Sequence, residues 1–106
     1  MARISRDRGN TYERELAAQL SDELGRVVKR RLGQARDSGH DLEVGPFVIE
    51  AKRRRRVGGA YLWLAQAVAA AQPGQIPTVI ARADGQESLV IVRLSDFIPL
   101  MRDAMP

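Results

Sequence analysis

Three residues in the middle of the chain, Asp41, Glu50 and Lys52, are of types that together can bind a cation and activate water. They flank a Gly45-Pro46 dipeptide, and Gly followed by Pro suits a two-residue type II′ hairpin turn. Counted back from that turn, Asp41 lies directly opposite Glu50, where paired Cβ atoms are ~4.5–5.5 Å apart. Strand alternation puts Lys52 on the same face as Glu50. The sequence therefore predicts two carboxylates and one ammonium together on one face of a β-hairpin.

Such a pair of carboxylates favours a metal ion. Opposed carboxylates repel each other, and a protein tolerates them by raising one pKa or by holding a cation between them. Oxygen ligands on a rigid hairpin suit Mg²⁺, which commonly takes one or two carboxylates and keeps several waters. Lys52 could then orient or help deprotonate a water, or stabilise charge in a transition state. Metal-assisted phosphodiester hydrolysis requires this combination; a solvated salt-bridge patch on the sheet is the alternative.

The elements that must hold this hairpin are predicted from hydrophobic periodicity and turn residues. Along the hairpin, alternation assigns an apolar face suited to a core to Leu42, Val44, Phe47, Ile49 and Ala51. Before the hairpin, the pattern predicts a helix over 12–24 that ends at Gly25, a strand over 27–32 and a loop over 33–40. After it, the pattern predicts a helix over 60–72, strands over 78–81 and 88–92, and a helix over 96–102 capped by Ser95. The order α-β-β-β-α-β-β-α favours an α/β fold with a mixed sheet flanked by helices. Residues 1–106 should form one domain, with 1–9 a flexible basic arm.

Composition bounds the class of protein. The 106 residues carry a formal net charge of +4 with a sequence pI of about 10.3, and a basic domain attracts polyanions such as nucleic acid. No apolar run approaches the ~20 residues that cross a bilayer, so no membrane association is expected. The absence of cysteine excludes disulfides, thiolate metal sites and cysteine nucleophiles, and it suits a cytoplasmic protein.

The sequence contains Asp41, then an apolar strand, then Glu50-Ala51-Lys52. This motif resembles that of the PD-(D/E)xK nuclease superfamily. The segment over 8–16, RGNTYEREL, resembles the first helix of archaeal-type Holliday-junction resolvases and related phage nucleases, in which a glutamate completes the metal site. By position that glutamate is Glu13. The resemblance implies a restriction-endonuclease-like core that binds Mg²⁺, or Mn²⁺ in its place, through Glu13, Asp41, Glu50 and Ala51. The implied catalytic residues are Glu13, Asp41, Glu50, Lys52 and Gln66.

Glu13 and Gln66 also have plainer interpretations. Glu13 falls on the same predicted helical face as Leu16 and Leu20, so it should point towards the sheet, where an acid needs a partner. It is also a residue type that a helix N-terminus favours. Gln66 stands where members of the superfamily often place a glutamine near the site, but it is equally a helix-surface residue. Nearby Trp63 is a candidate for the core, for a dimer interface or for base stacking.

Basic side chains near this centre are the candidates for holding DNA. The run Arg53, Arg54, Arg55 and Arg56 follows Lys52 directly, where the phosphates flanking a scissile bond would pass. Arginine suits bidentate phosphate contacts, and a solvated basic loop is the alternative. The other candidate DNA contacts are Arg8 in the arm and Arg36 and Ser38 in the loop before Asp41.

The resemblance implies a Mg²⁺-dependent, structure-selective endodeoxyribonuclease. A Holliday-junction resolvase that hydrolyses phosphodiester bonds in four-way-junction DNA is the leading candidate. Paired cuts suit a symmetric homodimer, for which the helix over 60–72 and the second hairpin are candidate surfaces. The alternatives are a phage or mobile-element nuclease that nicks or cuts flaps in other DNA structures, and a catalytically silent DNA-binding module of the same fold.

Overall fold

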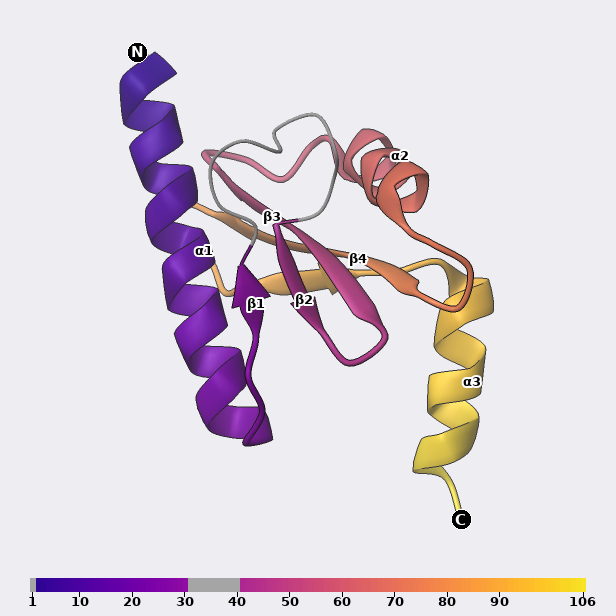
Figure 1. Cartoon of the computed structure of the whole chain (residues 1–106). Coiled ribbons are helices and arrows are strands. Elements are labelled where there is room, and N and C mark those ends of the chain that lie inside the picture. The colour runs from indigo at the N-terminus through magenta and orange to yellow at the C-terminus, as the bar shows by residue number, and fades with distance from the viewer. Residues whose placement is uncertain (1, 31–40) are drawn as a thin grey trace.

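The computed structural model describes residues 2–30 and 41–106, and of residues 2–8 it describes the backbone alone. The elements follow the chain in the expected order (Figure 1). They are α1 (Ala2–Leu24), β1 (Lys29–Arg30), β2 (Leu42–Val44), β3 (Phe47–Arg54), α2 (Ala60–Ala70), β4 (Ile76–Ala83), β5 (Leu89–Ile91) and α3 (Leu94–Ala104). The predicted α/β class, with a mixed sheet flanked by helices, is confirmed.

The strands form one five-stranded sheet in the order β1-β2-β3-β4-β5. Strands β3 and β4 are parallel and joined through α2, and the other neighbouring pairs are antiparallel. The hairpin turns at Gly45-Pro46 as predicted, because Val44 pairs with Phe47 and Gly45 has a φ of 53°, which glycine adopts without steric cost. Strand β3, which carries the Glu-x-Lys segment, therefore lies at the centre of the sheet and is paired on both sides.

The two faces of the sheet are covered by different helices. On one face α1 packs on a core of Tyr12, Leu16, Ala17, Val28, Leu42, Val44, Ile49 and Ile80, with Leu20, Phe47 and Ala51 at its margin. On the other face α2 packs Trp63 and Ala67 on Val79 and Ala81. All five residues predicted for the apolar face of the hairpin belong to the first core, so the two-residue alternation of the hairpin is confirmed.

The N-terminal segment differs from the expectation. Helix α1 begins at Ala2, so the backbone of residues 2–9 is helical and continuous with the predicted helix, while the flexibility expected of this arm stays a prediction. The segment contains no proline, and the one glycine within it costs a helix only about 1 kcal/mol relative to alanine. The predicted end of this helix is confirmed, because Gly25 has a φ of 63° and its N–H donates to the Ser21 carbonyl at 2.9 Å. The predicted loop over 33–40 lies outside the described residues.

The C-terminal helix also starts earlier than predicted. Ser95 lies inside α3, and the residue that precedes the helix is Arg93. The Arg93 carbonyl accepts the N–H groups of Asp96 and Phe97, each at 3.0 Å, and the Arg93 Nε donates to the Asp96 carboxylate at 2.9 Å. No side chain caps this end of the helix, so the predicted capping role of Ser95 is wrong. Figure 1 shows α3 extending away from the sheet, and none of its residues is buried.

Within the described part of the chain, no helix combines the length and the apolar character that crossing a bilayer requires.

Candidate active site

Asp41 lies immediately before β2 and beside Glu50, with an offset from the predicted pairing. The regular ladder between β2 and β3 ends at Leu42 and Ile49. The Asp41 N–H donates to the Ile49 carbonyl at 2.8 Å, one residue short of Glu50, and the Asp41 Oδ2 accepts the N–H of Ala51 at 2.8 Å. Asp41 thus bridges the positions on either side of Glu50, and the bond from Ala51 fixes its carboxylate.

Glu50 and Lys52 share one face of β3, as strand alternation predicts. The Lys52 Nζ lies 4.0 Å from the Glu50 Oε2, and the two side chains are 15% and 10% exposed. The intervening Ala51 packs at the margin of the core under α1, so Glu50 and Lys52 lie on the face that α2 covers. A carboxylate this buried requires charge or hydrogen-bond partners, and Lys52 supplies only one of them.

Glu13 reaches the same region from α1. Its side chain is 15% exposed, and its Oε1 lies 3.8 Å from the Nη2 of Arg30 on β1. The predicted inward orientation of Glu13 is therefore confirmed. Arg30 was not predicted as part of the site, because a two-residue strand of Lys and Arg gives no periodic signal. Its Nε is buried and has no hydrogen-bond partner among the described residues.

Burial and mutual repulsion raise the pKa values of two carboxyl groups in this cluster to about 7. For Glu50 the causes are burial first and then the charge of Asp41, with an added contribution from a hydrogen bond between the two carboxyl groups, while Lys52 opposes the shift. For Glu13 the causes are burial and then the charge of Asp41, and Arg30 opposes them. Carboxyl groups that hold protons near neutral pH for these reasons would release them to a divalent cation.

The comparison with protein-family models decides the family. The model described as "Phage putative PDDEXK endonuclease" matches residues 4–105, which is nearly the whole chain. The chain belongs to this family. No curated protein matches the chain.

As a member of the PD-(D/E)xK nucleases, a superfamily that generally uses divalent metal ions, the chain is expected to have carboxylates suited to such an ion. The paired carboxyls of Asp41 and Glu50 have the required oxygen chemistry, and Mg²⁺ needs only one or two carboxylates beside its waters. Among residues 2–30 and 41–106, however, no group of three or more His, Cys, Asp or Glu side chains could hold a metal ion. Glu13 therefore lies near the pair without converging on one point with it.

The remaining predicted members of this nuclease site either make no hydrogen bond to it or lie outside the described residues. Gln66 is exposed on α2, and no hydrogen bond joins it to a described residue, which agrees with a helix-surface residue. Arg36 and Ser38 lie outside the described residues, as does the side chain of Arg8. Trp63 is 8% exposed and packs in the second core, so of the three interpretations left open for it, the core is confirmed.

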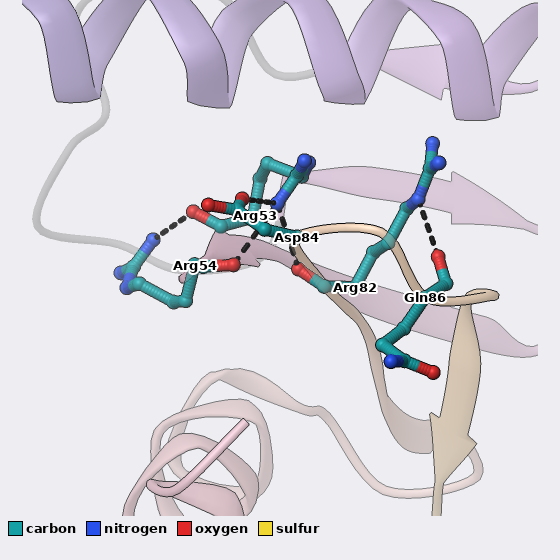
Figure 2. A network of polar contacts seen from close by, with 5 residues as sticks. All are labelled: Arg53, Arg54, Arg82, Asp84 and Gln86. Carbon is teal, nitrogen blue, oxygen red and sulfur yellow. Dashed lines mark hydrogen bonds and ion pairs between the residues drawn. The ribbon is translucent and has the colours of Figure 1, made fainter. Parts of the chain in front are cut away.

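The arginine run divides into different environments, which Figure 2 shows in part. The Arg53 Nη1 donates to the Asp84 carboxylate at 2.7 Å and to the carbonyls of Arg54 and Arg82 at 2.9 and 3.3 Å. The Arg82 Nε in turn donates to the Gln86 carbonyl at 2.7 Å. Arg53 thus ties the end of β3 to the turn after β4, a contact that sequence spacing gave no means of predicting.

The other members of the run are more open to solvent. Arg54, Arg55 and Arg56 are exposed, and the guanidinium of Arg54 lies over the ring of Trp63. Three of the four members are therefore accessible to a ligand, and the prediction that the run contacts DNA phosphates stays a prediction beside the solvated-loop alternative.

Proposed function

We propose that this protein is a divalent-metal-dependent endodeoxyribonuclease that cuts branched DNA, with a four-way junction as the leading substrate. The observation that carries the proposal is the Asp41–Glu50 pair. The Asp41 carboxylate, which accepts the N–H of Ala51, lies beside the buried Glu50 and its neighbour Lys52 in a chain of the PD-(D/E)xK family. A purely structural ion-pair patch would not bury one carboxyl, that of Glu50, beside a second carboxyl that repels it.

The proposed roles follow from the chemistry of the side chains. Asp41 and Glu50, with the backbone carbonyl of Ala51, would hold Mg²⁺ or Mn²⁺, which would supply Lewis acidity and an acidified water for hydrolysis. Lys52, at 4.0 Å from Glu50, orients the attacking water and stabilises negative charge that develops on the phosphate. Glu13 receives a proton or positions a second water from the side of α1. The basic edge formed by Arg54, Arg55 and Arg56 attracts the DNA backbone.

Cleavage assays with defined DNA structures test this proposal. Four-way junctions, flaps and linear duplexes are incubated with Mg²⁺ or EDTA, using wild type, Asp41→Asn, Glu50→Gln and the exposed control Glu87→Gln. We expect metal-dependent cutting of junctions by wild type and the control, and losses of at least about 100-fold in the two site variants. Preferential flap cutting would favour the nickase or flap nuclease alternative. No cutting of any substrate would favour a silent DNA-binding module.

We further propose that the protein works as a homodimer, since paired cuts across a junction require two sites. Exposed apolar side chains support this proposal: Tyr61 and Leu62 on α2 are 93% and 66% exposed, and Leu89 and Val90 on β5 are 53% and 64% exposed. Sedimentation of the purified protein at micromolar concentration tests it, and a monomer would contradict it. We also propose that the protein acts in the cytoplasm. A sequence without cysteine is compatible with that compartment.

A further inference from the structure

One arginine of the run lies in line with the candidate catalytic residues. Alternation along β3 puts Glu50, Lys52 and Arg54 on the same face. Two contacts agree with this: Lys52 lies 4.0 Å from Glu50, and the Cζ of Arg54 lies 5.9 Å from the ring centre of Trp63 on α2. The strand rise of about 3.3 Å per residue puts the Cα of Arg54 about 6.6 Å beyond that of Lys52. Arg54 therefore extends the row of candidate catalytic residues by one step.

The ring of Trp63 restricts where this guanidinium lies. Trp63 is 8% exposed, and the backbone of Gly59 comes so close that a Cβ there would lie 2.8 Å from the indole Cε2 and Nε1. The Arg54 Nη1 also donates to the Arg53 carbonyl at 3.1 Å. A ring packed on Gly59 and a cation–π contact hold the guanidinium near one position, so it loses less side-chain freedom when it binds an anion.

Charge distinguishes Arg54 from its neighbour Arg53. The guanidinium of Arg53 is 2.7 Å from the Asp84 carboxylate, and its side chain is 19% exposed. Arg54 is exposed, and among the described residues it has no carboxylate partner and makes no hydrogen bond beyond that of Nη1. Guanidinium carries five N–H donors, so most of those of Arg54 are available to a ligand. The ligand that suits a held, uncompensated guanidinium is a phosphate.

We propose that Arg54, held on Trp63, forms a phosphate-binding subsite for the DNA phosphodiester next to the one at Lys52. This inference rests on the proposed function and deepens it, because it makes the substrate strand run along β3 past Glu50, Lys52 and Arg54. Arg53 is then a structural residue that joins the ends of β3 and β4. One guanidinium, rather than the whole run, holds the phosphate adjacent to the scissile bond.

DNA binding measured without divalent metal tests the subsite. Trp63 is the one tryptophan of the chain, so its fluorescence reports on the ring beneath Arg54. A short DNA duplex is titrated into wild type, Arg54→Ala, Arg54→Lys and Arg102→Ala in EDTA over a series of salt concentrations. Arg102 is exposed on α3, and its removal changes the net charge equally.

The expected results separate Arg54 from a general charge effect. Arg54→Ala should weaken binding about tenfold and lower the slope of log K against log salt by about 0.9. Arg54→Lys should keep the slope but lose the fluorescence change of wild type, since the compact ammonium lacks the planar stack. Arg102→Ala should retain both the slope and the fluorescence change. If log K falls with log salt as steeply in Arg54→Ala as in Arg102→Ala, the proposal of a subsite is overturned.

The failure of this subsite and the failure of the nuclease proposal are distinguishable. A wild type that binds DNA with an Arg54-dependent slope, but cuts nothing when Mg²⁺ is added, would contradict the proposed function and support the subsite. A wild type that cuts DNA while Arg54→Ala binds with the unchanged slope would contradict the subsite and support the nuclease. Melting temperatures of all variants show whether each is folded, and the exposed position of Arg54 predicts little change.

Discussion

Replacing Glu50 by glutamine should stabilise the metal-free protein at alkaline pH while it abolishes cleavage. Burial and the neighbouring Asp41 raise the pKa of Glu50 from 4.5 to about 7. The folded state therefore holds this proton more tightly than the unfolded state. The resulting stability is present below about pH 4.5 and is lost as the pH rises to about 7. At about 1.4 kcal/mol per pKa unit, the loss is on the order of 3 kcal/mol.

Urea denaturation in EDTA at pH 5 and pH 8, followed by circular dichroism, measures this effect. Wild type should be less stable at pH 8 by about 2–3 kcal/mol from Glu50 alone, with Glu13 adding in the same direction. Glu50→Gln should flatten this dependence and exceed wild type at pH 8, because a neutral amide can donate to Asp41 without repulsion. Glu87→Gln, an exposed control, should behave as wild type. If the free energies of unfolding of wild type and Glu50→Gln differ by the same amount at both pH values, the reasoning is refuted.

Two further predictions concern the packing that holds the site. Gly59→Ala would bring a Cβ within 2.8 Å of the Trp63 indole. We expect it to lower the free energy of unfolding by about 1–3 kcal/mol and to shift the tryptophan fluorescence. Unchanged stability and emission would contradict the close approach. Tyr12→Phe removes the 2.7 Å hydrogen bond from α1 to Ser88 beyond β4, and it should lower the free energy of unfolding, measured in urea, by about 1 kcal/mol. If adding Ser88→Ala to this variant lowers the free energy by as much again, the bond does not couple the two residues.

The hairpin could be predicted from the sequence because several local signals agree. Gly45-Pro46 sets the turn, and the two-residue alternation around it assigns Ile49 to the core and Glu50 to the opposite face. These signals act over a few residues and depend on no distant contact. Glu13 was predictable for a similar reason, because helical periodicity places it on the face of α1 that packs on the sheet.

The rest depends on contacts between segments far apart in the sequence. The offset of Asp41 results from hydrogen bonds to Ile49 and Ala51 beyond the last regular pair, which a count from the turn does not reveal. The different environments of Arg53 and Arg54 arise from Asp84 and Trp63, which only the fold brings beside the end of β3. Neither partner has a sequence spacing that identifies it, so the four arginines were indistinguishable before the structure.

The central claim is that Asp41 and Glu50 form the metal-binding centre. Calorimetric titration of Mn²⁺ into the protein near pH 6.5 tests this claim most directly. Wild type should bind the ion and release protons, because Glu50 is largely protonated at that pH and must ionise to become a ligand. Asp41→Asn and Glu50→Gln should each weaken binding by at least about tenfold, and Glu50→Gln should also lose most of the proton release. Binding and proton release that are unchanged in both variants would contradict the account.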